Sequence, residues 1–295
     1  MRKRRVVVRD PDRLNREFYE SYDEAFLFRK AHTLLFIADH LDEFAEFITR
    51  CNGDTAPIDE RFAQGLCAEV YFTEFHQFEA FFALLLAVFQ DEPHWVYLTD
   101  YPPGHIKKMA EAFLERDVRS ATNGRMKRLD HFLNQSIYTG FASPDAEVAK
   151  NWQKNLDNIT WMLDRLATKY CDGLEEYNSY KHGLRVFASP SYIRFTPTGS
   201  QQGGFGFTSK NSVRFLVKEP PQEGMLTFKL VSEPFSPEES LHHLLFMADV
   251  LETVKSTRLA AIRREKEPQL NSYVALNKDD LRELAAKAPK WSLSL

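Results

Sequence analysis

The residues that could do chemistry in this chain gather near its middle, in the run Tyr177-Asn178-Ser179-Tyr180-Lys181-His182-Gly183. The run ends a long stretch with helical periodicity, so Asn178 and His182, four residues apart, share one face of a helix. Lys181 lies beside them, three residues after Asn178. Lysine and asparagine donate hydrogen bonds to anionic oxygens, and histidine exchanges a proton near neutral pH. Asn178, Lys181 and His182 are therefore the candidate catalytic residues, suited to phosphate binding and proton transfer.

The same residues are also what a helix end requires. Lys181 and His182 fall in the last helical turn, where cations interact favourably with the helix dipole, and Gly183 is a preferred helix terminator. In this alternative, the side chains stabilise the helix and carry no chemistry. The sequence leaves both interpretations open.

Asn178 and His182 resemble part of the motif of the HEPN family, compact helical-bundle domains of prokaryotic defence, toxin and nucleotide-handling systems. That motif is an arginine, a polar residue directly after it, and a histidine four to six positions after the arginine. In members that are ribonucleases, two such motifs meet across a homodimer and cleave RNA without metal. The resemblance implies a helical bundle, a homodimer, an RNA or nucleotide ligand and no cofactor.

Tyr177 occupies the position at which the motif carries arginine. Without a guanidinium group the transition-state phosphate loses a planar pair of donors, which Lys181 replaces poorly. We therefore expect weak or no metal-independent endoribonuclease activity, with binding as the residual function. A second match in spacing runs from Arg125 to His131, but Met126 stands at its polar position.

A second polar set lies within an apolar stretch at 59–90. Helical spacing places Glu69, His76 and Glu79 on one side of that helix. Buried ionisable groups need partners, so this set faces water, pairs with a neighbouring helix or lines a site. The sequence does not decide between these three.

Metal-ligand patterns are incomplete. A di-iron bundle needs two Glu-x-x-His motifs, and the chain has one, from Glu239 to His242. We therefore predict no metal site, and we expect His242 and His243 to lie on a helix surface.

Apolar residues recur at helical spacing over much of the chain. The expected helices cover 14–50, 59–90, 105–117, 124–138, 143–182 and 236–265. Asn52-Gly53 ends the first of them, and Ser236-Pro237-Glu238-Glu239 caps the last. Between 184 and 233 the period changes to two, which predicts four or five short antiparallel strands joined by hairpins.

The predicted fold is mainly α (α+β), a helical bundle with a small antiparallel β-sheet inserted before the last long helix. We expect one domain over residues 1–270, with the β insertion at about 184–233. We expect residues 271–295 to form a C-terminal extension with a short helix capped by Asn277. The 24 phenylalanines, beside 12 glycines, favour a well-packed helical core.

Composition and charge narrow the class of protein further. A formal net charge of -4 argues against a protein whose whole surface binds nucleic acid. The basic runs at 2–5, 125–128 and 263–266 could still come together as a local RNA-binding surface. The three cysteines have no paired spacing, which favours reduced thiols in a cytoplasm. The most apolar stretch, at 81–89, is about half of a membrane span, so no membrane association is expected.

Two functions follow from the sequence. The first is a HEPN-like RNA- or nucleotide-interacting protein of a prokaryotic defence or stress system, homodimeric, with weak or lost ribonuclease activity. The second is a non-catalytic α-helical module for protein–protein interaction. They differ in whether Asn178, Lys181 and His182 point into a cleft or only complete a helix end.

Overall fold

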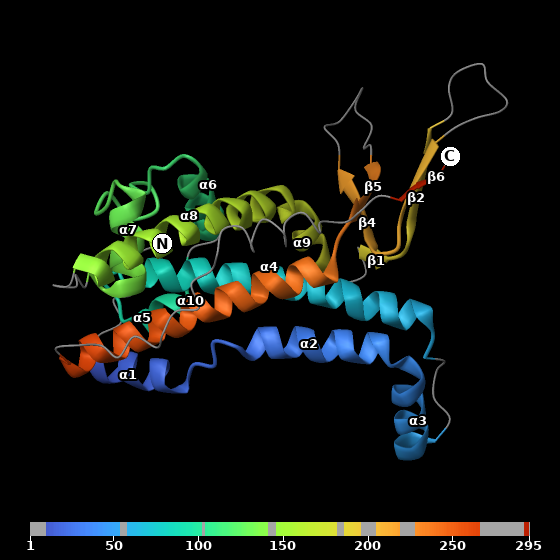
Figure 1. Cartoon of the computed structure of the whole chain (residues 1–295), viewed down its shortest axis with the longest axis horizontal. Coiled ribbons are helices and arrows are strands. Elements are labelled where there is room, and N and C mark those ends of the chain that lie inside the picture. Colours follow the sequence, from blue (N-terminus) through green and yellow to red (C-terminus); the bar gives the residue numbers. More distant parts are fainter. Residues whose placement is uncertain are drawn as a thin grey trace. The chain divides into compact units, whose positions relative to one another are not determined.

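The computed structural model describes residues 10–53, 58–101, 104–140, 146–181, 186–195, 205–218, 228–265 and 292–294. Within them the chain is mainly helical, with a small three-stranded antiparallel sheet before the last long helix, α10 (Pro237–Arg263) (Figure 1). The predicted fold class is confirmed. In these ranges no helix combines the length and the apolar character that crossing a membrane requires.

The first predicted helix is in fact three helices, α1 (Pro11–Ser21), α2 (Phe26–Asp39) and α3 (Leu41–Asn52). The side chain of Asp10 caps α1 by accepting a backbone hydrogen bond of 2.9 Å from its first turn. The expected stop is confirmed at Gly53, whose φ of 72° suits glycine. A continuous helix over 14–50 is wrong, and neither break carries a glycine or a proline that would have marked it.

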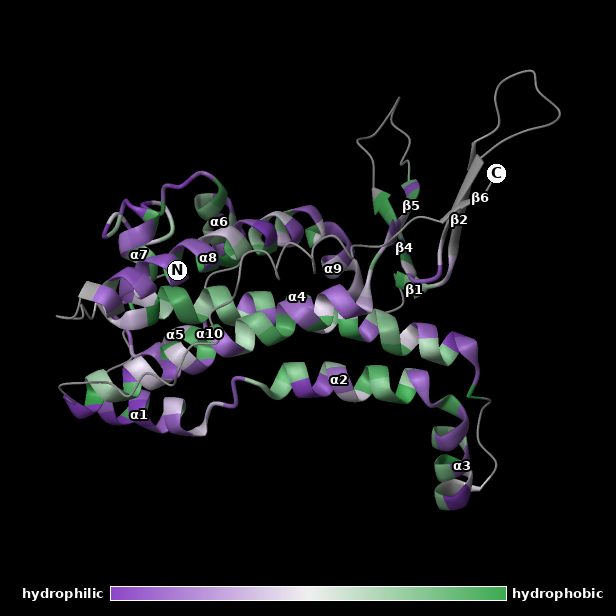
Figure 2. Cartoon of the chain, viewed as in Figure 1, coloured by the Kyte–Doolittle hydropathy of each residue, from purple (hydrophilic) through white to green (hydrophobic). Residues whose placement is uncertain are grey.

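Helix α4 (Glu60–Ala87) matches the helix predicted over 59–90. Asp59 caps it, because its carboxylate accepts hydrogen bonds from the N–H groups of Arg61 and Phe62 at 3.0 and 3.2 Å. The later turns are apolar on every side and buried, as expected of a core helix. By contrast, hydrophobic and hydrophilic residues alternate along α2 and α3 (Figure 2).

Three shorter helices follow, α5 (His94–Thr99), α6 (His105–Leu114) and α7 (Leu129–Tyr138). Helices α6 and α7 correspond to those predicted at 105–117 and 124–138. Helix α5 has no counterpart in the prediction, because six residues are too few to show a helical period. Helix α7 begins later than predicted because the residues before it form a loop.

The helix predicted over 143–182 is divided into α8 (Ala146–Asp172) and α9 (Leu174–Lys181) at Gly173. The ring of Phe75 packs where a side chain at position 173 would lie, and a β-carbon there would collide with the ring's Cζ atom. Glycine is therefore required at this position by the close approach of Phe75. The predicted helix end at His182 lies outside the described residues.

We expect Gly173→Ala to lower the free energy of unfolding by about 1–3 kcal/mol, because the added methyl group overpacks the ring of Phe75. Urea unfolding followed by circular dichroism measures the change. Gly65→Ala, within α4, is the matched control, because a β-carbon at Gly65 meets nothing within 4 Å. Alanine there should stabilise the helix slightly. Equal effects of the two substitutions would contradict the role assigned to Phe75.

The strands form two three-stranded antiparallel sheets. One contains β1 (Val186–Ala188), β4 (Ser212–Lys218) and β5 (Phe228–Pro234) in the order β1-β4-β5. The other contains β2 (Ser191–Phe195), β3 (Phe205–Ser209) and β6 (Ser292–Ser294) in the order β2-β3-β6. Strands β1 to β5 confirm the antiparallel pairing predicted for the insertion, whereas β6 comes from the C-terminal extension.

Backbone contacts group the chain into two compact units. The first unit comprises Met1–Phe26, His76–Asp172 and Leu245–Leu281, and the second comprises Leu27–Phe75, Gly173–Leu244 and Arg282–Leu295. Helices α4 and α10 contribute residues to both units, so the single domain predicted over 1–270 stays a prediction. The short helix predicted at Asn277 lies outside the described residues.

Candidate functional site

Two of the three predicted catalytic residues are described, and both lie on α9 in the second unit. Asn178 and Lys181 are exposed. The Lys181 ammonium group lies 4.2 Å from the centre of the Tyr177 ring, which is a cation–π contact. His182 lies outside the described residues, so its convergence with Asn178 and Lys181 stays a prediction.

Tyr177 belongs to the core of the second unit. Its side chain is 0% exposed, and its ring stacks on that of Phe75 with the ring centres 5.1 Å apart. Position 177 therefore points into packed protein, whereas a phosphate group approaches from solvent.

Buried polar contacts join the helices of the second unit. Tyr71 of α4 donates a hydrogen bond to Glu176 of α9, and His243 Nδ1 of α10 lies 2.5 Å from Glu74 Oε1 of α4. Burial, with the nearby carboxylate of Glu176, raises the pKa of Tyr71, which keeps this phenol protonated. The prediction that His243 lies on the surface is wrong, because its imidazole contacts the buried Glu74.

Glu69 belongs to the same group of contacts. It pairs with Lys30 of α2 at 2.8 Å and accepts a hydrogen bond of 2.5 Å from Tyr180 of α9. Partly buried carboxylates need such partners, so we assign these contacts to the packing of the second unit. Glu69 thus has a separate environment from His76 and Glu79, which belong to the first unit.

His76 and Glu79 line a cavity of about 320 Å³ in the first unit. Much of the remaining lining is aromatic or aliphatic, with Phe18 and Tyr22 near the end of α1 and Trp95 on α5. The size and the mixture of an apolar wall with a few polar groups are typical of small-molecule sites. We call this space the aromatic cavity.

Contacts between α1 and α5 position the wall of the aromatic cavity. The Asn15 side chain accepts a hydrogen bond of 2.7 Å from the backbone N–H of His94, the first residue of α5. The Tyr19 hydroxyl lies 2.8 Å from His94 Nδ1. Next to these residues, the rings of Phe18 and Trp95 contact each other with centres 5.9 Å apart.

Glu79 sets the electrostatics of the aromatic cavity. Tyr170 of α8 donates a long hydrogen bond of 3.5 Å to Glu79. Burial, and then the Glu79 carboxylate, raise the pKa of both Tyr170 and Tyr101, so both phenols keep their protons near neutral pH. Among the described lining residues none is lysine or arginine. The cavity therefore suits a flat organic group with hydrogen-bond donors better than it suits phosphate.

The aromatic surface continues beyond this cavity. A hollow of about 350 Å³ shares Phe18, Tyr22 and Trp95 with it and adds Asp23 and Phe26. Phe26 and Trp95 are exposed large apolar side chains. A ligand larger than one ring system could therefore extend from the cavity over exposed aromatic side chains.

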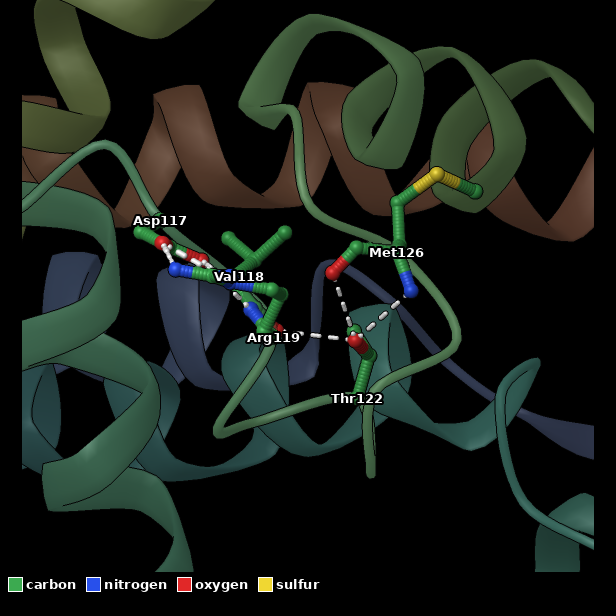
Figure 3. Close-up of polar contacts among 5 residues, drawn as sticks. All are labelled: Asp117, Val118, Arg119, Thr122 and Met126. Atoms are coloured by element: carbon green, nitrogen blue, oxygen red, sulfur yellow. Dashed lines mark hydrogen bonds and ion pairs between the residues drawn. The ribbon is translucent and has the colours of Figure 1, made fainter.

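The loop between α6 and α7 contains the basic run at 125–128 and is held by internal hydrogen bonds (Figure 3). The hydroxyl oxygen of Thr122 lies 2.8 Å from the carbonyl oxygen of Val118 and accepts a hydrogen bond of 3.0 Å from the N–H of Met126. The guanidinium of Arg119 contacts both carboxylate oxygens of Asp117 (Figure 3).

The arginines of this region are paired with acids. Their contacts are Arg116 with Asp164 at 2.6 Å, Arg119 with Asp117 at 2.5 Å, Arg125 with Asp91 at 2.5 Å and Arg128 with Asp130 at 2.5 Å. The neighbouring carboxylates offset the positive charge that a phosphate backbone would need. In the second motif match, Arg125 also donates to the carbonyl of Phe89 at 2.7 Å.

Comparisons with protein-family models, curated proteins and solved structures found no match to this chain. The resemblance to the HEPN family therefore stays a prediction that rests on its motif residues. Within the described ranges, no group of three or more His, Cys, Asp or Glu side chains is placed to hold a metal ion.

The sequence indicated part of the aromatic cavity. Helical spacing put His76 and Glu79 on one side of α4, where both line the cavity. Phe18 and Trp95 were missed as site residues, because they come from distant parts of the sequence and no motif links them. The signal that could have identified Trp95 is a large aromatic side chain two residues after Pro93, in a short segment of its own.

Proposed function

We propose that the protein binds RNA or nucleotides and that the aromatic cavity takes the base. The observation that carries the proposal is the combination of a Phe18–Trp95 aromatic wall with the Glu79 carboxylate in one cavity. Aromatic side chains stack on any base, and each stacked base contributes about 1–3 kcal/mol. A volume of about 320 Å³ is of the size expected for a small organic ligand.

Glu79 provides selectivity in this proposal. A carboxylate accepts hydrogen bonds from exocyclic amino groups of bases, as glutamate and aspartate do with cytosine. Cytosine, adenine and guanine carry such a group and uracil does not. The protonated Tyr101 phenol can donate to a ring nitrogen or carbonyl oxygen of the same base. The phosphate then stays outside the cavity, which agrees with the lack of cationic lining residues.

Cleavage is expected to be weak or absent. The burial of Tyr177 supports this expectation, because the residue at the arginine position of the resembling motif is part of the core. Asn178 and Lys181 are exposed on α9, and amide and ammonium groups donate hydrogen bonds to phosphate oxygens. Membership of a prokaryotic defence or stress system is part of the same proposal.

Isothermal titration calorimetry with cytidine, adenosine, guanosine and uridine tests the proposal. We expect the three amino-bearing nucleosides to bind more tightly than uridine. Glu79→Gln should weaken their binding by about 10–100-fold, because a hydrogen bond to a charged group contributes about 1.5–3 kcal/mol. Trp95→Ala should weaken all four, because it removes stacking.

Glu69→Gln is the matched control, since it makes the same change on the same helix but in the second unit. It should leave nucleoside affinity unchanged. Failure of all four nucleosides to bind at millimolar concentration, or binding that Glu79→Gln and Trp95→Ala leave intact, would refute the assignment of the cavity.

A non-catalytic protein–protein interaction module is the second candidate. Exposed aromatic side chains favour it, namely Phe36 on α2 and Phe47 on α3. The calorimetry separates the two candidates, because a pure protein-interaction module has no reason to discriminate cytidine from uridine.

A further inference from the structure

The hollow next to the aromatic cavity has a lining of its own. It has a volume of about 350 Å³ and lies wholly within the first unit. We call it the aromatic hollow, and its lining residues are Phe18, Ser21, Tyr22, Asp23, Phe26 and Trp95. Most of these side chains are aromatic, and one is a carboxylate. Asp23 and Phe26 do not line the aromatic cavity, so the two spaces can be tested separately.

The rings of the aromatic hollow come from neighbouring helices. Phe18 lies on α1, and Trp95 lies on α5, which contacts α1 (Figure 1). The centre of the Phe18 ring is 5.4 Å from that of Tyr22 and 5.9 Å from that of Trp95. These rings are tilted rather than stacked, and Phe26 and Trp95 are 59% and 41% exposed. Aromatic surface therefore remains uncovered for a ligand.

The segment that carries Tyr22 and Asp23 is held by contacts from outside the hollow. Lys255 of α10 donates a hydrogen bond of 2.7 Å to the carbonyl of Tyr22 and pairs with Glu24 at 2.9 Å. The Asp23 carboxylate accepts a hydrogen bond of 3.3 Å from the N–H of Ala25. A lining that is already held in place loses little conformational entropy when a ligand binds.

The charges around the aromatic hollow favour a cation. Near neutral pH, Asp23 is the charged group among the described lining residues, which include no lysine, arginine or histidine. The nearby ammonium group of Lys255 is paired with Glu24, so it does not neutralise Asp23 as well. Burial, followed by the Glu24 carboxylate, raises the pKa of Tyr22, so this phenol stays neutral. An anion would therefore be repelled from the hollow.

The lining also selects among cations. A primary ammonium or guanidinium group carries several N–H donors, and each of them needs an acceptor when it leaves water. Aromatic rings supply few acceptors. A quaternary ammonium group has no N–H donor, its methyl groups pack against ring faces, and its charge is attracted by those faces, most strongly by tryptophan. The rings and the carboxylate of the hollow together match this kind of cation.

We propose that the aromatic hollow binds a small, free organic cation that carries a trimethylammonium group. Sites for small molecules span about 300–1,000 Å³, and the hollow lies at the lower end of that range, which favours a small ligand. The proposal goes beyond nucleoside binding and does not depend on it, because Asp23 and Phe26 belong to the hollow and not to the cavity.

Isothermal titration calorimetry of the full chain with choline tests the proposal. The comparison ligand is the uncharged isostere of choline, in which a tert-butyl group replaces the trimethylammonium group. We expect choline to bind about 3–30-fold more tightly than the isostere, because choline alone is attracted by the ring faces. Equal affinities would overturn the proposal, because they would show that the hollow recognises apolar surface and not charge.

Two substitutions separate the charge from the rings. Asp23→Asn should weaken choline binding by about 3–10-fold, while asparagine still accepts the hydrogen bond from Ala25. Phe26→Leu should weaken choline binding to a similar degree and leave the isostere unaffected, because leucine keeps the apolar contact but has no ring face. Both positions are exposed, so circular dichroism should show folded variants.

Each substitution has a matched control. Asp12→Asn makes the first change at an exposed aspartate in the first turn of α1. Phe36→Leu makes the second change at an exposed phenylalanine of α2, in the second unit. Both should leave the affinity for choline unchanged. A control that weakens choline binding as much as its test variant would overturn the assignment to the hollow.

The remaining outcomes distinguish this site from its alternatives. Choline binding that Glu79→Gln abolishes and Asp23→Asn leaves intact would overturn the proposal by placing the cation in the aromatic cavity. If free choline failed to bind at millimolar concentration, the proposal would be overturned as well. Cosedimentation with phosphatidylcholine vesicles in that case would assign the hollow to a lipid headgroup. Asp23→Asn should leave nucleoside affinity unchanged, so either binding assignment can fail without the other.

Discussion

Replacing Arg258 by alanine is expected to lower the free energy of unfolding by about 3–5 kcal/mol, because it removes a donor and leaves a cavity. Arg258 of α10 is 3% exposed, and its guanidinium donates to the carbonyl of Ser136 at 2.5 Å. The preceding residue, Thr257, donates to the carbonyl of Ile137 at 2.6 Å. Both carbonyls lie in the last turn of α7, where a helix has no partners of its own for them.

Burial lowers the pKa of Arg258, so the location of its charge carries a cost. The C-terminus of a helix carries a partial negative charge, so the end of α7 offsets part of that cost. Ser136 in turn donates its hydroxyl to the carbonyl of Leu85 in α4 at 3.0 Å. Arg258 therefore supports a chain of hydrogen bonds through α10, α7 and α4 in the first unit.

Arg263→Ala provides the control for Arg258→Ala on the same helix. Arg263 is paired with Glu20 at 3.0 Å, and both side chains are 46% exposed. An exposed pair contributes at most about 1 kcal/mol, so its loss should be small. Urea denaturation of both variants measures the difference. If Arg258→Ala cost no more than Arg263→Ala, the C-terminal carbonyls of α7 would not depend on Arg258.

The fold class could be predicted because the hydrophobic period is local information. Three signals depend only on neighbours in the sequence. They are the helical spacing up to about residue 182, the period of two after it, and the Ser236 cap of α10. The helix breaks could not be predicted in the same way. The helix is interrupted at Gly173, and the ring that requires glycine there belongs to Phe75, almost one hundred residues away. Glycine alone is tolerated inside many helices, so it did not mark the break.

The same distinction applies to the candidate site. Spacing on α4 placed Glu69, His76 and Glu79 on one side, but it could not tell which neighbours cover each turn. Glu69 is covered by Lys30 and Tyr180, whereas Glu79 lines a cavity whose wall comes from α1 and α5. Partners of that kind depend on the tertiary structure. His243 shows the same limit, because nothing near it in sequence indicates that Glu74 is buried beside it.

Stability is expected to fall with acid in a way that depends on His94. Burial, with a smaller contribution from the nearby Arg258, lowers the pKa of His94 from 6.5 to about 3. Between these two values the unfolded chain binds a proton that the folded chain does not, so stability falls as the pH drops below about 6.5 and is fully present above it. Each unit of pKa difference is about 1.4 kcal/mol, so the loss between pH 7 and pH 4.5 is about 2–3 kcal/mol.

Urea unfolding of the wild type and of His94→Asn at pH 7 and pH 4.5 measures this contribution. Asparagine does not titrate and can still accept the hydrogen bond from Tyr19, so the variant should lose about 2–3 kcal/mol less than the wild type over this interval. His131→Asn, at an exposed histidine, is the control and should behave as the wild type does. An equal acid loss in wild type and His94→Asn would contradict the prediction.

Protonation of His94 should also affect ligand binding in the aromatic cavity. His94 joins α5 to α1 through Tyr19 and Asn15, and these two helices carry Trp95 and Phe18. In the folded chain His94 gains its proton only near pH 3. A proton on Nδ1 removes the acceptor for the Tyr19 hydroxyl, so acid in that range should loosen the wall on which a base stacks. Nucleoside affinity of the wild type should then fall with acid, and His94→Asn should reduce that dependence while Glu79→Gln lowers affinity at every pH.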